Sequence, residues 1–169
     1  MSEFTIRLAT ENDLEAIRAI YNYYVVHSTC TYQLELDTAE ERLAWFRNRD
    51  RAVHPVTVAE ADGEVIGWAA LSRWNTRAGY AKTAEASVYI HHEHHRRGLG
   101  KALLLDLVAR AKAAGLHTII GGASSDQTAS LALQTAAGFV TVGTFRQTGR
   151  KFDRWLDVTY TQLMLEPEA

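Results

Sequence analysis

The segment Ala84–Leu104 reads AEASVYIHHEHHRRGLGKALL. It begins with a β-rich run, Ser87–Ile90, and continues through a loop that ends at Arg97-Gly98-Leu99-Gly100. The apolar residues that follow recur with the spacing of one buried helix face: Leu99, Leu103, Leu104, Leu107, Val108 and Ala111. Glycines directly before a helix let backbone amides turn toward a ligand, and with the helix dipole these amides form an anion site suited to a phosphate. The segment therefore indicates docking of a ligand that carries a pyrophosphate.

Motifs on both sides of this segment narrow its interpretation, although Gly98-Leu99-Gly100 matches neither the dinucleotide fingerprint nor the P-loop. Upstream lies a W-x-x-R-x-x-Y-x-x-T-x-E run, made of Trp74, Arg77, Tyr80, Thr83 and Glu85. Downstream lie Gly138-Phe139 and a final motif made of Gly149, Lys151, Phe152, Trp155, Leu156, Asp157 and Val158. From Ile6 to about Leu165 the chain resembles the GNAT acyltransferases, whose motif A is a strand, [QR]-x-x-G-x-[GA] and a helix. Within them it is most similar to the phosphinothricin and methionine sulfone or sulfoximine N-acetyltransferases.

Composition favours one α/β domain over residues 1–169, long enough to bury a core. A formal net charge of −2 argues against nucleic-acid binding. The single cysteine, Cys30, cannot form an internal disulfide, so nothing requires an oxidising compartment; a small packed residue is its expected role. The N-terminus has no apolar signal core, and no apolar run approaches a membrane span. We therefore expect a cytoplasmic protein with no membrane or nucleic-acid partner.

Hydrophobic periodicity predicts the element order β-α-α-β-β-β-α-β-α-β-β. Two early helices follow the caps Thr10 and either Asp37 or Thr38, and two later helices are expected over 100–114 and 126–137. Strands are expected over 4–8, 56–61, 65–71, 87–90, 117–121, 140–145 and 155–165, with Gly149-Arg150-Lys151 lying between the last two. Residues 73–82 form a polar loop at the mouth of a site. A GNAT fold has this order, as a single-domain mixed sheet flanked by helices, whereas propensity alone indicates only a mixed α/β domain.

The resemblance implies acetyl-CoA as co-substrate. In GNAT enzymes the first strand of motif A is splayed from the next one, so its backbone groups bind the pantetheine arm and the thioester oxygen. The glycine loop holds the pyrophosphate through amides and local positive charge. The coenzyme-binding residues expected on this basis are Val88, Tyr89, Ile90, Arg96, Arg97, Gly98, Leu99, Gly100, Lys101 and Gln127.

Acetyl transfer to an amine requires that the amine lose its proton, so a base near the acceptor helps. Glu85 is the leading candidate because it stands on the motif A strand, where the family carries a functional Glu. The fork of Arg77 suits the carboxylate of an amino-acid acceptor. The substrate-binding residues expected from the resemblance are Asn75, Thr76, Arg77, Glu85, Ala86 and Ser87, with Trp74, Tyr80 and Tyr32 as further wall candidates.

Several positions depart from the family pattern. His95 replaces the Gln or Arg of motif A, and Gln127 stands where Asn is frequent. Gln134 occupies the position of a Tyr that protonates the thiolate in many GNAT enzymes, so no general acid is assigned. Arg150 replaces the Tyr of the family's G-Y-K stretch, which would shift acceptor preference toward more acidic molecules.

We therefore predict direct acetyl transfer from acetyl-CoA to the α-amine of a small amino-acid-like acceptor such as phosphinothricin, methionine sulfone or methionine sulfoximine. The resemblance also suggests a homodimer. A GNAT acting on a polyamine, an aminoglycoside or a protein N-terminus remains open, as does a non-catalytic acyl-CoA sensor. The tract His91–His95 with Arg96 and Arg97 leaves a metal or nucleic-acid module as a further alternative. We expect no metal there, because nothing supplies a closed Cys/His set.

Overall fold

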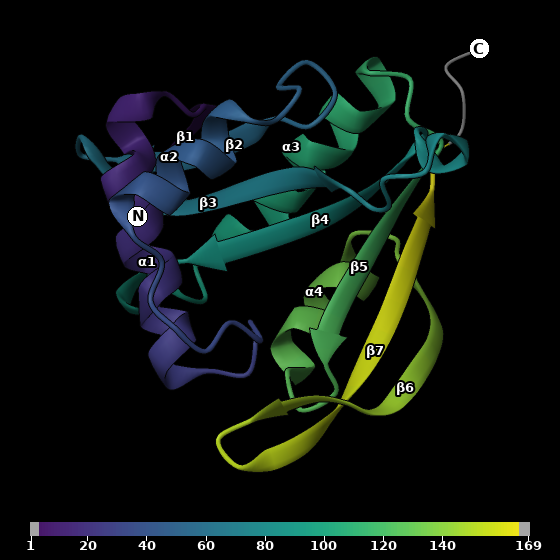
Figure 1. Cartoon of the computed structure of the whole chain (residues 1–169). Helices are drawn as coiled ribbons and strands as arrows, with labels where there is room; N and C mark the ends of the chain where they lie inside the picture. The colour runs from purple at the N-terminus through teal and green to yellow at the C-terminus, as the bar shows by residue number, and fades with distance from the viewer. Residues whose placement is uncertain (1–3, 166–169) are drawn as a thin grey trace.

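The computed structural model of this chain describes residues 4–165. Its helices and strands follow the predicted order (Figure 1). The elements are β1 (Thr5–Leu8), α1 (Leu14–His27), α2 (Ala39–Arg47), β2 (Val56–Ala61), β3 (Glu64–Arg73), β4 (Thr83–Ile90), α3 (Leu99–Ala113), β5 (Thr118–Ser124), α4 (Thr128–Ala136), β6 (Val140–Lys151) and β7 (Arg154–Met164). Short 3₁₀ turns lie at Glu11–Asp13 (η1), Ala78–Tyr80 (η2) and His92–His94 (η3).

The strands form one mixed sheet in the order β1-β2-β3-β4-β5-β7-β6. Every neighbouring pair is antiparallel except β4 and β5, which are parallel. A parallel pair needs a crossover, and here α3 provides it after the glycine loop. The predicted α/β fold with a mixed sheet flanked by helices is confirmed.

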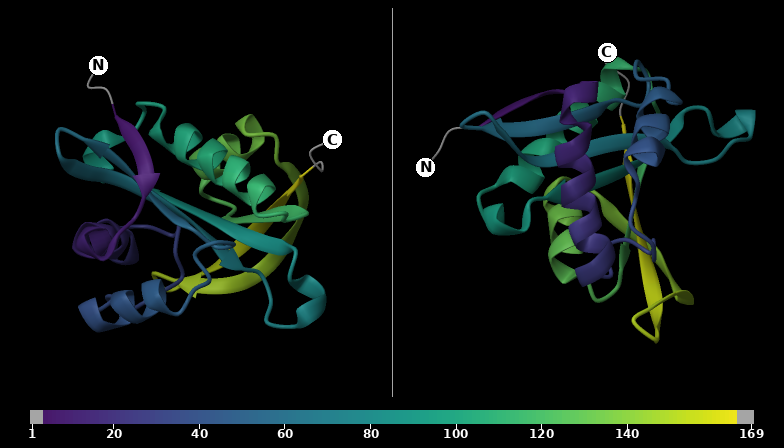
Figure 2. Two further views of the ribbon diagram at one scale, coloured as in Figure 1. Left: turned by 90° about the horizontal axis from the view of Figure 1, so that it is seen from above. Right: turned by 60° about the vertical axis from the view of Figure 1, so that its left-hand side comes forward.

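Helices cover both faces of the sheet, with α1 and α2 on one side and α3 and α4 on the other (Figure 2). The predicted apolar face of α3 is buried: Leu103 and Leu107 are fully enclosed against Ala69 and Ile119 of the sheet. On the opposite face, Ile17, Phe46 and Trp68 lie in a second cluster with the strand residues Val56, Val58 and Ala70. Each fully buried side chain of this size contributes about 1.5–3 kcal/mol, so these two layers hold the helices on the sheet.

Helix ends follow the expected chemistry. Thr38 caps α2 in a capping box: its hydroxyl accepts from Glu41 N at 3.1 Å, and Thr38 N donates to the Glu41 carboxylate at 2.8 Å. Thr10 precedes η1 rather than α1, and Asp13 binds its backbone N–H at 2.7 Å. Gly115, just beyond α3, has a φ of +68°, the left-handed conformation that stops the helix.

Several predicted boundaries were wrong. The strand expected over 65–71 spans Glu64–Arg73, and the strand expected over 117–121 spans Thr118–Ser124. The strand before the glycine loop begins at Thr83 rather than Ser87, and α4 begins at Thr128 rather than Asp126. The segment Gly149-Arg150-Lys151 is not a connection, because β6 continues to Lys151 and pairs with β7 along these residues. The pairing resumes after a register shift between Phe145 and Gly149. This irregularity breaks the alternation by which the continuing strand would have been recognised.

Candidate active site

Strands β4 and β5 separate shortly after they pair. Only three residue pairs join them, and the last is Glu85 with Ile120. The other edge of β4 stays paired with β3 up to Ile90, so the strand itself remains regular. Figure 1 shows the two strands starting together and then diverging. The backbone groups of residues 86–90 that face β5 therefore have no strand partner, and they are free to bind an extended ligand.

Two adjoining cavities occupy this divergence, each of about 390 Å³. One, here called the sheet cavity, lies between β4 and β5; the other, the loop cavity, lies beside the glycine loop. They share the wall residues Cys30, Val88, Tyr89, Ser130 and Leu133. Because these residues border both, the cavities form one cleft that runs along the splayed strand and ends at the start of α3.

The glycine loop presents the N-terminus of α3 to the loop cavity. Gly98 lies immediately before the helix with a φ of +77°, and Arg96 also has a positive φ, +63°. Leu99 anchors the turn, since only 2% of its surface is exposed. The first amides of a helix have no partner within the helix, so this end suits an anionic group. At Gly100 a Cβ would lie 3.1 Å from Leu133 Cδ2, and glycine therefore lets α4 approach closely.

Tyr24 ties the glycine loop to α1. Its hydroxyl donates to the carbonyl of Ile90, at the end of β4, and lies 2.6 Å from Nε2 of His95. His95 stands at the motif A position that is usually Gln or Arg. Its ring contacts Tyr24 of α1. Gln127 lines the same cavity, and its amide nitrogen donates to Thr29 Oγ1 at 2.7 Å. The loop cavity is thus tied to α1 and to the segment that follows it.

Glu85 lies in the wall of the sheet cavity at the point where the strands part. Its carboxylate has no hydrogen-bond partner among residues 4–165, and its burial raises the pKa of the carboxyl above the ordinary Glu value. A Cβ on Gly122 would lie 3.9 Å from Glu85 Oε1. A carboxylate with a raised pKa and free oxygens can accept a proton from a group in the cavity.

Aromatic rings close the sheet cavity. Tyr160 lines it and meets Trp74 and Phe145 edge to face, with ring centroids 5.8 and 5.6 Å apart. Burial, and then the neighbouring Glu85 carboxylate, raise the pKa of Tyr160. Tyr32 lines the cavity as well, and its hydroxyl is buried without a partner among the described residues. Such a hydroxyl is available to a polar group of a bound acceptor.

Lys151 holds the β6–β7 hairpin against this wall. Its Nζ donates to the carbonyls of Thr31 at 2.8 Å and Tyr24 at 3.3 Å, and 4% of the residue is exposed. These bonds fix the hairpin beside the segment that carries Tyr32. Lys151 was recognised in the sequence only as part of the final motif; the structure gives it this anchoring role.

Most of the sequence-predicted site residues meet in the cleft. Those lining the sheet cavity are Glu85, Ala86, Ser87, Val88 and Tyr89. Those lining the loop cavity are Val88, Tyr89, Ile90, Arg96, Gly98, Leu99, Gly100 and Gln127. The three further wall candidates lie in different places. Tyr32 lines the sheet cavity, Trp74 packs behind it on Tyr160, and Tyr80 is exposed.

Five predicted residues line neither cavity. Arg97 and Lys101 are exposed at the loop and at the first turn of α3, with Arg97 Nη1 3.3 Å from His94 Nδ1. Asn75, Thr76 and Arg77 lie on the loop between β3 and β4, where Arg77 N donates to Asn75 Oδ1 at 3.0 Å. Arg77 is exposed. The roles of these five residues stay predictions.

Sequence reasoning missed several residues of the cleft, among them Tyr160, Tyr24 and Cys30. Tyr24 was expected only as part of the buried face of α1, and its hydroxyl gave no signal of its own. Cys30 was expected as a small packed residue, whereas it is half-buried and lines both cavities, and burial raises the pKa of its thiol. Within residues 4–165 no group of three or more His, Cys, Asp or Glu side chains is placed to hold a metal. No helix in the described part of the chain is long and apolar enough to cross a membrane.

A mixed sheet whose parallel central strands diverge over a glycine loop and a helix N-terminus defines the class of coenzyme-dependent acyltransferases. The family model described as "Acetyltransferase (GNAT) domain" matches residues 6–160. The chain therefore belongs to the GNAT acetyltransferase family, and it is an acetyltransferase whose co-substrate is acetyl-CoA.

Named relatives cover nearly the whole chain. L-amino acid N-acyltransferase MnaT of Escherichia coli is 40% identical over 169 residues, covering 98% of both chains. An L-methionine sulfoximine/L-methionine sulfone acetyltransferase of Salmonella typhimurium is 38% identical over 165 residues, 98% of this chain and 96% of its own. The Phosphinothricin N-acetyltransferase of Alcaligenes faecalis is 36% identical over 160 residues, 94% and 81% of the two chains. The predicted branch of the family is confirmed.

A solved structure matches the fold closely. The structure of yncA, a putative acetyltransferase from Salmonella typhimurium with its cofactor acetyl-CoA, has a TM-score of 0.93 at 38% identity. The match covers 98% of this chain and 96% of that one.

Proposed function

We propose that this chain transfers an acetyl group directly from acetyl-CoA to the α-amine of a small amino-acid-like acceptor. The observation that carries the proposal is the Glu85 carboxylate, partly buried and without a partner in the described chain, at the point where β4 and β5 part. The names of the relatives supply the acceptor class, since they act on L-amino acids, methionine sulfoximine, methionine sulfone and phosphinothricin. The cytoplasm is the proposed location, because acetyl-CoA is available there.

In the proposed reaction the acceptor amine gives a proton to Glu85, directly or through water, and its nitrogen attacks the thioester carbon. The amides of Val88 and Ile90, which face away from β3, stabilise the developing charge on the carbonyl oxygen. The carbon–sulfur bond then breaks and the coenzyme leaves as a thiolate. The amides at Gly98 to Lys101 hold the pyrophosphate, and Arg96 and Arg97 add positive charge around it.

Direct transfer, rather than an acetyl-enzyme, is favoured by the state of the thiol that lines the cleft. Cys30 borders both cavities, but burial raises the pKa of its thiol and so disfavours the reactive thiolate. We expect no acetylated protein when acetyl-CoA is added without an acceptor, as measured by intact mass, and a Cys30→Ser variant that keeps its activity. An acetylated Cys30 that reacts on with added acceptor would replace this mechanism.

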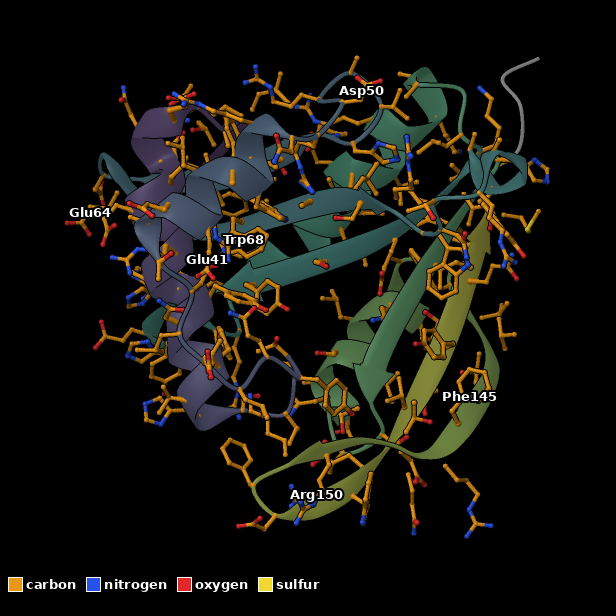
Figure 3. The ribbon with its side chains drawn as sticks, in the orientation of Figure 1. Glu41, Asp50, Glu64, Trp68, Phe145 and Arg150 are labelled. Carbon is orange, nitrogen blue, oxygen red and sulfur yellow. The ribbon has the colours of Figure 1, made fainter. Side chains whose placement is uncertain are left out.

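Thiol release with acetyl-CoA tests the function across methionine sulfone, methionine sulfoximine, phosphinothricin, spermidine and an aminoglycoside. We expect turnover on the amino-acid-like acceptors. Glu85→Gln is expected to lower kcat/KM by about 10²–10⁴, the usual contribution of a general base. Glu64→Gln is the matched control, because Glu64 is an exposed carboxylate on β3, far from the cleft (Figure 3).

The pH profile adds a second readout. Because the pKa of Glu85 is raised, its carboxylate is protonated at a higher pH than that of an ordinary Glu. As the pH is lowered, activity should therefore begin to fall at a pH above the usual titration range of Glu. This acid limb should disappear in Glu85→Gln.

Turnover only on spermidine or the aminoglycoside would show that the chain is a GNAT enzyme with a different acceptor. Acetyl-CoA binding without turnover on any amine would instead favour a sensor.

We further propose that two copies of the chain associate as a homodimer. The outer strand β6 and the neighbouring β7 expose large apolar side chains, among them Val140, Val142, Phe145 and Trp155, each 61–66% exposed. Figure 3 shows Phe145 on the outer side of the sheet. A patch of this kind on an edge strand marks an interaction surface. Light scattering should give a dimer for the wild type and a monomer for Phe145→Glu. Leu34→Glu, a change at an exposed apolar residue outside the patch, is the control.

A further inference from the structure

A buried hydroxyl joins the segment after α1 to the start of α4. Thr29 follows α1, and 4% of the residue is exposed. Its Oγ1 donates to Oδ1 of Asp126 at 2.7 Å and accepts from Nε2 of Gln127, also at 2.7 Å. Asp126 and Gln127 belong to the connection between β5 and α4, and Figure 1 shows the segment after α1 approaching this end of α4. Two segments far apart in the chain therefore meet at one threonine.

The carboxylate of Asp126 fixes the direction of both hydrogen bonds. An aspartate is ionised at neutral pH, and its oxygens can then only accept. The hydroxyl of Thr29 has a single hydrogen, and this hydrogen goes to Asp126. Thr29 Oγ1 can therefore only accept from the side chain of Gln127. The Gln127 amide must in consequence turn its nitrogen toward Thr29 and its oxygen away from it.

Ser28 receives the other hydrogen of the same amide nitrogen. Its Oγ lies 3.3 Å from Gln127 Nε2, and it also accepts from the backbone N–H of Cys30 at 3.1 Å. The amide nitrogen of Gln127 is thus fully used by the segment after α1. Oε1 of Gln127, in contrast, has no hydrogen-bond partner among residues 4–165. This oxygen is left as a free acceptor.

The backbone of Gln127 is held in place, so only the side chain decides where this oxygen lies. Its N–H donates to the carbonyl of Ser124 at 2.8 Å, and its own carbonyl accepts from the N–H of Leu131 at 3.2 Å. Gln127 directly precedes α4, but its side chain makes no capping bond to any described residue of the helix. The short side chains that favour this position turn back to the helix, whereas the longer glutamine reaches across to Ser28 and Thr29. The free oxygen therefore belongs to the loop cavity, which Gln127 lines.

The loop cavity offers what an extended ligand with amide groups needs. Val88 and Ile90 line it, and their backbone groups that face away from β3 have no strand partner in the described chain. Leu99 and Leu133 add apolar surface. The pantetheine arm of acetyl-CoA carries two amides, and each N–H loses its water when the arm enters the cleft. An acceptor oxygen held ready in the wall offsets this loss.

We propose that Thr29 and Asp126 are positioning residues for the coenzyme, which hold Oε1 of Gln127 where it accepts from a pantetheine N–H. The sequence predicts contact with the coenzyme for Gln127 and gives no role to the other two residues. Arg154 of β7 supports the same carboxylate, since its Nη2 donates to Asp126 Oδ2 at 3.1 Å. The assignment goes beyond the proposed function, because it concerns the coenzyme alone and is the same for every acceptor.

Calorimetric titration with two ligands tests the assignment without any acceptor. One ligand is CoA; the other is adenosine 3′-phosphate 5′-diphosphate, which keeps the nucleotide and the pyrophosphate but lacks the pantetheine arm. Thr29→Val keeps the shape of the side chain and removes the hydroxyl. It should raise the Kd of CoA about three- to tenfold, the effect of one hydrogen bond, and leave the Kd of the nucleotide unchanged. Thr29→Ser, which keeps the hydroxyl, should bind both ligands as the wild type does.

Two further variants test the direction of the hydrogen bonds and the route through Gln127. In Asp126→Asn the new amide can donate to Thr29, so the hydroxyl can donate to Gln127 and the Gln127 amide can turn over. We expect the same selective rise in the Kd of CoA. Gln127→Ala should raise it by a similar factor, and adding Thr29→Val to this variant should have no further effect, because Thr29 acts through Gln127.

Thr128→Val is the matched control, since Thr128 is exposed, follows Gln127 and lines neither cavity of the cleft. It should bind both ligands as the wild type does. Equal losses of affinity for both ligands in Thr29→Val would show a merely structural role and overturn the proposal. Effects of Thr29→Val and Gln127→Ala that add in full would overturn it as well, as would an unchanged Kd of CoA in Thr29→Val and Asp126→Asn. If no amino acid is acetylated, the proposed function fails, while the comparison of the two ligands still decides the roles of Thr29 and Asp126.

Discussion

Gly149 lies on β6 directly beneath the ring of Tyr32. A Cβ at this position would be 2.3 Å from Cε1, 2.7 Å from Cδ1 and 2.8 Å from Cζ of the ring. Ordinary contact begins at 3.4 Å, so in Gly149→Ala the ring or the strand must move by about 1 Å. Tyr32 lines the sheet cavity, and the displacement therefore reaches the wall of the proposed acceptor site.

Two magnitudes follow from this movement. A misplacement of about 1 Å in a positioned reaction costs about 10²-fold in rate, so kcat/KM for the acceptor should fall by about that factor. Overpacking costs about 1–3 kcal/mol, and each kcal/mol lowers the Tm of a domain of this size by about 2–4 °C. Gly149→Ala should therefore be several degrees less stable as well as less active.

Thiol release and thermal unfolding measure both effects. Gly143→Ala is the matched control, since Gly143 lies on the same strand and a Cβ there meets nothing within 4 Å. Adding Tyr32→Leu to Gly149→Ala, which removes the ring, should restore the Tm but not the activity. If Gly149→Ala matches Gly143→Ala in both measurements, the contact of Tyr32 with β6 does not shape the cleft.

Three further changes test other parts of the structure. Asp13→Asn should lower the unfolding free energy by about 1–3 kcal/mol at neutral pH. The hydrogen bonds of Arg7 hold the pKa of Asp13 below its usual value, so this contribution is lost as the pH falls through that pKa, and denaturant titrations at successively lower pH should show the difference between variant and wild type shrinking. Tyr24→Phe should raise the KM for acetyl-CoA severalfold with little change in kcat, because the bonds to Ile90 and His95 are lost; an unchanged KM would contradict this positioning role. Gly98→Ala should lower stability by about 1–2 kcal/mol through its positive φ alone, as seen in the Tm, since a Cβ there meets no atom within 4 Å.

The sequence predicted the order of elements because each signal is local. The apolar spacing of α3, the glycine after it and the cap of α2 at Thr38 each depend on neighbouring residues, and the structure agrees at all three. The end of β6 depends instead on its pairing with β7 across a register shift. That pairing is tertiary, and the exposed polar residues from Arg146 to Thr148 give no alternation by which to extend the strand.

The residues of the site likewise separate into those that a local motif marks and those that only tertiary packing brings to the cleft. Glu85 and the glycine loop could be placed from one continuous motif, and both lie in the cleft. Tyr24 reaches Ile90 across 66 positions of the chain, and no local pattern marks a tyrosine on a helix face as such a contact.

Gln134, which stands where many GNAT enzymes have a Tyr, affects how the coenzyme thiolate can leave. Gln134 lines the sheet cavity, and its Oε1 accepts from Thr161 Oγ1 at 2.6 Å, which leaves the amide N–H groups as its free donors. An amide can stabilise a departing thiolate by donating a hydrogen bond, but it has no acidic proton to transfer. A thiol has a pKa near 8.5, so the thiolate is a stable enough leaving group to depart without prior protonation. The demanding proton transfer is therefore the one from the acceptor amine, and in the proposed mechanism it goes to the carboxylate of Glu85, which is partly buried and has no partner among residues 4–165.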